Sequence, residues 1–219
     1  MTNSRDLVLA RVRQALGVAP DAMPAPAPAP YEPAVPRSYL REHGVRGAEE
    51  TVDLLAGNLT DYRARVHRCA RADVADTVGA LLAARGARTV LVPPGLPDAW
   101  LPGGIIVRRD TADSTPHDLD RVDSVITGCA VAIAETGTIV LDGGPGQGRR
   151  RITLIPDHHI CVVEVPAQVV SSVPRALERL SVTRPLTWTS GPSATSDIEL
   201  DRVEGVHGPR SLDVVLLLG

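Results

Sequence analysis

The sequence predicts a mixed α/β fold in which a mostly parallel sheet is flanked by helices. Helix-like segments alternate with short apolar runs along most of the chain, which is the order expected for a sheet covered on both faces. The aromatic fraction is only 2% and phenylalanine is absent, so the core must come from Val, Leu, Ile and Ala. Because many of these residues are β-branched, they favour buried strands over a helical bundle.

The N-terminal part of the chain differs in composition from the rest. Residues 1–17 carry apolar side chains on one face and predict an amphipathic helix that ends at Gly17. Residues 18–44 contain an alternating Pro/Ala run, which holds the backbone extended and predicts a semi-rigid linker. The helix can dock on its own domain or be offered to another subunit, and the sequence leaves both open. The compact domain is expected to span residues 45–219.

Within the compact domain, apolar spacing predicts three helices and several strands. The helices are expected at 52–66, 73–85 and 168–180, where apolar residues recur every three or four positions. The gap between 130–134 and 138–141 is short enough for an antiparallel hairpin. The predicted strands cover residues 89–92, 105–107, 125–134, 138–141, 152–155, 160–165 and 214–218.

Composition excludes several classes of function. All 23 basic residues are Arg, so Schiff-base chemistry, a Ser-Lys dyad and a Walker lysine are excluded. A net charge of -3 and a pI near 6.1 argue against nucleic acid as the main partner. The three cysteines are far apart, so no metal site or cofactor is expected in this chain. The chain has no membrane-length apolar run or signal peptide, which predicts a cytoplasmic protein.

Two polar loops in the middle of the chain are candidates for chemistry, because ligands collect at strand ends in such folds. The turn Ala134–Thr138 presents Glu135 beside Gly137, which can take positive φ, although a plain hairpin with an exposed Glu is equally compatible. The loop Gly143–Gly148 precedes three arginines. It is expected to be mobile and can attract a carboxylate or phosphate, but it lacks the ending of a P-loop.

A third loop, residues 191–199, is rich in hydroxyl groups and in backbone N–H groups that can cradle an anion. Its carboxylates can equally cap or brace neighbouring loops. The binding candidates in this loop are Gly191, Ser193, Thr195 and Asp197.

A fourth loop, residues 205–210, precedes the last predicted strand. His207 and Arg210 can hold and protonate a carboxylate there, although a structural His in a turn is the commoner case. Upstream, His158 and His159 are of metal-ligand type. Adjacent residues of an extended chain point to opposite faces, however, so we do not expect a metal site.

Three segments of the sequence resemble the LUD-domain family, in particular its lactate-utilisation C branch. They are ITGCAVAIAETGTIVL at 126–141, RRITLIPDHHICVV at 150–163 and TSGPSATSDIELDRVEGVHGPRSLDVVLL at 189–217. The strings GPSATSDIE and GVHGP, placed after ETGT, are more specific together than any one alone. The resemblance covers about residues 45–219, which would then be a LUD domain. It implies a fold like that of the NagB, ribose-5-phosphate isomerase and CoA-transferase group.

The resemblance implies a subunit of an L-lactate utilisation system that oxidises lactate to pyruvate with iron–sulfur and cysteine-rich partner subunits. Because this chain has no cluster motif, iron–sulfur clusters are expected in those partners. This chain would be a non-redox subunit that binds a small carboxylate or a phosphate-bearing ligand, with Glu135 and His207 as catalytic candidates and Gly137, Thr138 and Arg210 among the binding ones.

Two alternatives stay open. One is a CoA-transferase or acyl-CoA hydrolase-like enzyme with Glu135 as nucleophile and the Gly137 and Thr138 N–H groups as oxyanion donors. The other is a non-catalytic scaffold that binds carboxylates. Turnover of acyl-CoA would distinguish the first alternative from the second.

Overall fold

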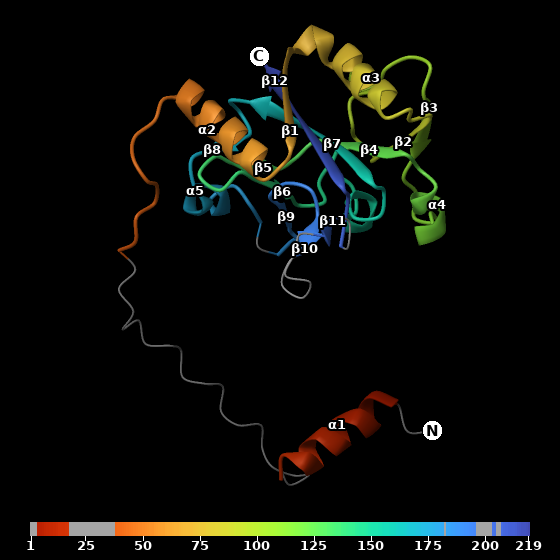
Figure 1. Cartoon of the computed structure of the whole chain (residues 1–219). Coiled ribbons are helices and arrows are strands. Elements are labelled where there is room, and N and C mark those ends of the chain that lie inside the picture. Colours follow the sequence, from red (N-terminus) through yellow and green to blue (C-terminus); the bar gives the residue numbers. More distant parts are fainter. Residues whose placement is uncertain (1–3, 18–37, 182, 196–202, 205–206) are drawn as a thin grey trace. The chain divides into compact units, whose positions relative to one another are not determined.

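The computed structural model describes residues 4–17, 38–181, 183–195, 203–204 and 207–219. The chain divides into two compact units, Met1–Tyr39 and Leu40–Gly219. The first contains helix α1 (Ser4–Ala15), where the sequence predicts a helix (Figure 1). The Pro/Ala run lies within residues 18–37, outside the described residues, so the linker stays a prediction. In the described part of the chain, no helix has both the length and the apolar character needed to cross a membrane.

Six parallel strands form the central sheet of the second unit, in the order β1-β12-β7-β4-β2-β3 (Figure 1). Strand β12 pairs with β7 along its whole length and with β1 on its other side. Both β7 and β12 are almost entirely buried, as expected for parallel strands covered on two faces. The predicted mixed α/β class is therefore confirmed. The six strands are β1 (Arg65–Ala70), β2 (Thr89–Val92), β3 (Ile106–Arg109), β4 (Ser124–Thr127), β7 (His158–Val165) and β12 (Ser211–Leu218).

A smaller sheet has the strand order β8-β5-β6-β9. Strands β5 and β6 pair antiparallel across the AETGT turn, which confirms the predicted hairpin. A two-stranded ribbon, β10 with β11, completes the β-structure of the described residues. The bounds are β5 (Val131–Ile133), β6 (Thr138–Leu141), β8 (Val169–Val170), β9 (Thr187–Thr189), β10 (Ala194–Thr195) and β11 (Val203–Glu204).

Helices and the smaller sheet cover the two faces of the central sheet. Helix α3 (Val74–Ala84) and the 3-10 turn η2 (Asp98–Trp100) pack on one face, through a core cluster that includes Val215 and Leu217. Helix α2 (Ala48–Asp61) and the inner face of the smaller sheet pack on the other, against Val214 and Leu216. Helix α5 (Val173–Leu177) covers the outer face of the smaller sheet. Helix α4 (Pro116–Asp120) and the 3-10 turn η3 (Arg150–Thr153) complete the core beside β2 and β4.

Two predicted helices are longer than those of the structure. The helix predicted at 52–66 ends at Asp61, and Val66 lies in β1, where it pairs with Val214 of β12. In the segment predicted as a helix at 168–180, Val169 and Val170 pair with β5, as suits β-branched residues. The helix there begins only after Ser172, whose hydroxyl caps it.

Two predicted strands also differ. The run 125–134 is broken at Gly128 into β4 and β5, which belong to different sheets. Residues 152–155 form no strand, because η3 turns the chain and buries Ile152 against Leu91 and Val125. The apolar character of Ile152 reflects this burial, while Leu154 is exposed. The hydrophobic pattern alone does not distinguish such a turn from a short strand.

Candidate functional site

A cavity of about 460 Å³ opens at the amino ends of β7 and β12. Five segments bring polar side chains to it: η3, the start of β7, strand β9, the loop after β9 and the turn before β12. Hydroxyl groups, one guanidinium and two imidazoles therefore share a single hollow. The lining includes Arg150, Thr153, His159, residues 187–194, residues 207–209 and Leu212.

Arg150 is the cation of this cavity. Its neighbour Arg149 donates to the buried carboxylate of Asp110, with 2.8 Å between Nε and Oδ2, and Arg151 donates to the backbone carbonyl oxygen of Ser114. The Arg150 side chain is exposed, and among the described residues its guanidinium has neither an ion pair nor a hydrogen-bond partner. A guanidinium without an internal partner can make a bidentate contact with a carboxylate or phosphate.

His159 supplies a buried imidazole to the same cavity. Its Nε2 lies 2.7 Å from the Thr127 hydroxyl, and its side chain is almost completely buried. Burial, with a smaller contribution from the nearby His158, lowers the pKa of His159 to about 3. The ring is therefore neutral at neutral pH, and it offers hydrogen bonding without charge.

The loop after β9 and the turn before β12 are hydrogen-bonded to each other. The backbone N–H of Ser193 donates to the Pro209 carbonyl oxygen at 2.8 Å, and the backbone N–H of His207 donates to the Ser193 hydroxyl at 3.2 Å. Gly191 has a φ of +83°, and a β-carbon there would overlap the carbonyl oxygen of Tyr62. The loop path therefore requires glycine at this position.

The AETGT turn lies behind the cavity wall. The Thr138 hydroxyl is 2.7 Å from the Ser190 hydroxyl, and Ser190 lines the cavity. Gly137 packs so closely on α2 that a β-carbon there would lie 2.8 Å from the Asn58 carbonyl carbon. This turn therefore braces the cavity without contributing to its lining.

Glu135 belongs to a separate polar cluster. One of its carboxylate oxygens accepts from the His43 backbone N–H at 2.7 Å, and the other lies 3.0 Å from His43 Nδ1. Arg46 is 3.4 Å from the first oxygen. Burial raises the pKa of Glu135, but the hydrogen bonds and charges of His43 and Arg46 outweigh it, so the pKa lies below its ordinary value. The segment before α2 thus covers this carboxylate.

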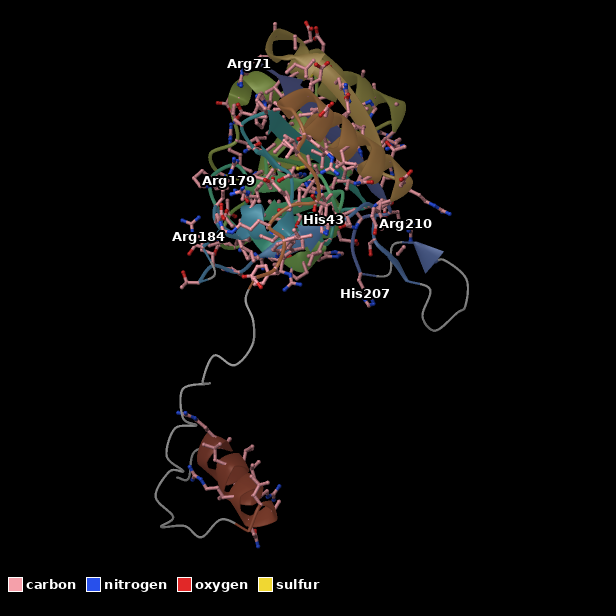
Figure 2. All side chains as sticks on the ribbon, turned by 90° about the vertical axis from the view of Figure 1, so that its left-hand side faces the viewer. His43, Arg71, Arg179, Arg184, His207 and Arg210 are labelled. Carbon is pink, nitrogen blue, oxygen red and sulfur yellow. The ribbon has the colours of Figure 1, made fainter. Side chains whose placement is uncertain are left out.

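The structure brings together only part of the predicted site. Gly191, Ser193 and His207 line the same cavity. Thr138 does not line it, but its hydroxyl is hydrogen-bonded to that of Ser190, which does. Arg210 lines a neighbouring cavity of about 630 Å³, which also includes His207 and Gly208 in its lining. The Nε atom of Arg210 is 3.6 Å from Asp157 Oδ1. Figure 2 shows His207 and Arg210 on the same side of the domain.

The remaining predicted residues lie elsewhere. Glu135 and Gly137 are absent from the lining of both cavities. Thr195 is in β10, and nothing further is described of its side chain. Asp197 falls outside the described residues. Glu135 therefore lies apart from the residues that line the two cavities, because the packing of Gly137 on α2 directs this turn toward residues 43–46.

Sequence reasoning missed several polar contributors to the cavity, among them Arg150, Thr153, Thr187, Thr189 and Ser190. The three arginines after the Gly-rich loop did indicate a site that attracts anions. They did not show which of the three guanidinium groups lacks an internal partner. The hydroxyl-rich string TWTS at 187–190 was the other available signal.

A second polar network surrounds the buried carboxylate of Asp213 at the amino edge of the central sheet. Asp213 accepts hydrogen bonds from Arg65 Nε at 2.9 Å, His67 Nε2 at 2.7 Å and His158 Nε2 at 2.7 Å. Burial raises the pKa of Asp213, but these three partners lower it far more, so the carboxylate stays ionised. His158 also contacts the Ser124 hydroxyl at 2.8 Å. His158 and His159 thus contact different partners from opposite faces of β7.

Comparison with known proteins identifies the family. The LUD domain profile matches residues 52–217. The chain belongs to the LUD-domain family. A Deinococcus radiodurans protein named lactate utilization protein C is 44% identical over 94% of this chain and 91% of its own length. A protein of the same name from Bacillus licheniformis is 29% identical over 73% of this chain and 76% of its own length.

A solved structure agrees with this assignment. A crystal structure of a DUF162 family protein from Deinococcus radiodurans superposes with a TM-score of 0.69 and 38% identity, covering 80% of this chain and all (100%) of that one. Every residue that lines the cavity lies within the matched LUD domain, residues 52–217. The cavity is thus built from the LUD domain alone.

Proposed function

We propose that this LUD-domain protein is a subunit of an L-lactate utilisation system and that it binds a small carboxylate in the cavity at Arg150. Two relatives that cover most of the chain carry the name lactate utilization protein C. The observation that carries the binding proposal is the exposed Arg150 guanidinium, which has no partner among the described residues and lies beside a hydroxyl-rich wall.

The cavity chemistry suits a 2-hydroxy or 2-oxo acid. Arg150 pairs with the carboxylate, and the Ser190 and Ser193 hydroxyls can donate to its oxygens. The neutral ring of His159 can hydrogen-bond to the 2-hydroxyl or 2-oxo group without adding charge. His207 is exposed at the rim and adds a second imidazole to the lining.

Oxidation of L-lactate to pyruvate releases two electrons and two protons. We place the electron acceptors in iron–sulfur and cysteine-rich partner subunits, because the three cysteines of this chain, Cys69, Cys129 and Cys161, are buried and widely spaced in sequence. In this division of labour, the chain contributes ligand binding and assembly. Co-purification from the native host, with lactate-dependent reduction of the partner clusters, would support it. A protein recovered alone would contradict it.

Calorimetric titration tests the binding site. Lactate, pyruvate and phosphate are titrated into the wild-type chain and into the Arg150→Gln variant. The substitution should weaken carboxylate binding by about tenfold or more, because a charge-assisted hydrogen bond contributes roughly 1.5–3 kcal/mol. Arg108→Gln is the matched control, because Arg108 is exposed on β3 and lies outside both cavities. Equal affinity in the wild type and both variants would refute the site.

The acyl-transfer alternative stays a prediction with its own test. Both carboxylate oxygens of Glu135 are engaged by His43, so nucleophilic attack first requires residues 43–46 to move away. Acyl-CoA hydrolysis or transfer is measured with the wild type and with Glu135→Gln. Turnover that disappears in the variant would favour this alternative, and no turnover in either protein would favour the binding subunit.

A further inference from the structure

We infer that the ligand of the Arg150 site is a carboxylic acid larger than lactate, bound across two cavities that meet at Arg150. The inference rests on the proposed carboxylate binding and concerns the size and chemistry of the acid. It begins from a second cavity, of about 510 Å³, next to the first. Arg150, Thr153 and Thr187 line both cavities. These three side chains form a common wall, and Arg150 is its charged member.

The volumes indicate a ligand of more than three carbons. Each cavity alone falls in the range of roughly 300–1,000 Å³ that is typical of sites for drug-sized ligands. A three-carbon acid held at Arg150 would leave most of the first cavity, of about 460 Å³, and all of the second to water. An acid with a longer substituent can keep its carboxylate at the junction and bury its remaining atoms.

The chemistry of the second cavity favours an uncharged substituent. Its other two arginines are neutralised internally, since Arg184 pairs with Asp142 at 2.8 Å and Arg149 pairs with Asp110. Most of the remaining lining is apolar or backbone, contributed by Leu141, Gly143, Gly144, Pro145, Gly148 and Pro185. Among the described lining residues, Arg150 is therefore the guanidinium without an internal partner. The class of ligand that fits is a 2-hydroxy or 2-oxo acid with an extended, largely apolar substituent.

The test compares acids of increasing length. Lactate, 2-hydroxyhexanoate and 3-phenyllactate are titrated into the full chain by calorimetry. We expect the affinity to rise roughly fourfold for each added methylene that becomes buried. Pro185→Trp and Pro145→Trp place bulk in the second cavity from two different loops, and Pro185 is absent from the first cavity. Both variants should lose the gain for the longer acids, and Pro185→Trp should bind lactate as the wild type does.

The controls separate this inference from the proposed function. Ala112→Trp adds the same bulk to a third cavity, which Ala112 lines without reaching the second, and it should preserve the gain. Melting temperatures identify any variant that is unfolded. If lactate binds through Arg150 but longer acids bind no more tightly, this inference is overturned and the proposed function stands. A gain that survives in both folded tryptophan variants overturns it as well. If no acid binds, both proposals fail.

Discussion

The buried imidazole of His159 should make the domain sensitive to acid. Its pKa is about 3 in the folded chain, against an ordinary value of 6.5. Between these values the unfolded state binds the proton and the folded state does not, so stability falls as pH falls. From about pH 7.5 to about pH 5, this one group should remove about 2 kcal/mol of the free energy of unfolding, because each pKa unit corresponds to about 1.4 kcal/mol.

The assay is urea denaturation followed by tryptophan fluorescence at several pH values. His159→Gln keeps a side chain able to hydrogen-bond to the Thr127 hydroxyl but removes the titrating group. The variant should therefore lose about 2 kcal/mol less than the wild type over the same pH interval. The lowered pKa of His158 acts in the same direction and remains in both proteins. Parallel stability curves for the two proteins would refute the assignment to His159.

Two further perturbations test the packing around the site. Arg65→Met removes one of the three partners of the buried Asp213 carboxylate, and denaturation should show a loss of roughly 1.5–3 kcal/mol. A loss within error of zero would mean that the histidine partners suffice. Gly191→Ala should cost at least about 2 kcal/mol, because the new β-carbon overlaps Tyr62 at a positive φ. Gly86→Ala is its control: φ is +66° but no atom lies within 4 Å, so the cost should stay near 1 kcal/mol. Equal costs would refute the close approach.

The local patterns predicted most of the fold. Strands β7 and β12 are continuous apolar runs, and the β5–β6 hairpin has apolar runs around a short Gly-containing turn, so each carries its signal in a few residues. The end of α2 was missed because Val66 continues the helical spacing by coincidence. Its true partner is Val214 of β12, more than a hundred residues away. Hydrophobic spacing does not report such a long-range pairing.

The site was harder to predict, because the state of a side chain depends on distant partners. The sequence does not distinguish between the three consecutive arginines, Arg149, Arg150 and Arg151. In the structure, two of them are hydrogen-bonded to the segment that follows β3. Arg149 binds Asp110, and Arg151 binds a carbonyl oxygen of Ser114. Which arginine remains available is therefore decided by tertiary structure. Tertiary structure also decides the environment of Glu135. The hairpin turn that carries Glu135 was predicted correctly, but its hydrogen bond with His43 was not predicted.

The position of the cavity also has a structural cause. Open α/β sheets usually bind ligands beyond the carboxyl ends of their strands. Here the loop Gly143–Gly148 covers the carboxyl ends of β2 and β4. The Gly146 N–H donates to the Pro94 carbonyl oxygen at 2.9 Å, and the Gly128 N–H donates to the Gly146 carbonyl oxygen at 2.8 Å. The cavity at Arg150 lies instead at the amino ends of β7 and β12.

This loop should set the position of Arg150 through Gly148. A β-carbon on Gly148 would overlap the Ile152 side chain and lie 2.7 Å from Pro93 Cβ, and Ile152 belongs to the same 3-10 turn as Arg150. Gly148→Ala must therefore shift Ile152 or Pro93. Because Ile152 belongs to η3, we expect this shift to move η3 and to weaken carboxylate binding by roughly tenfold while the domain stays folded. Gly143→Ala is the matched control, because its φ of +72° carries a similar strain but the nearest atom to its β-carbon is 3.7 Å away. Calorimetry with lactate decides the matter, because Gly143 lies outside the first cavity. If both variants bind as the wild type does, the loop does not position Arg150. If both weaken binding equally, backbone strain and not the contact with Ile152 is responsible.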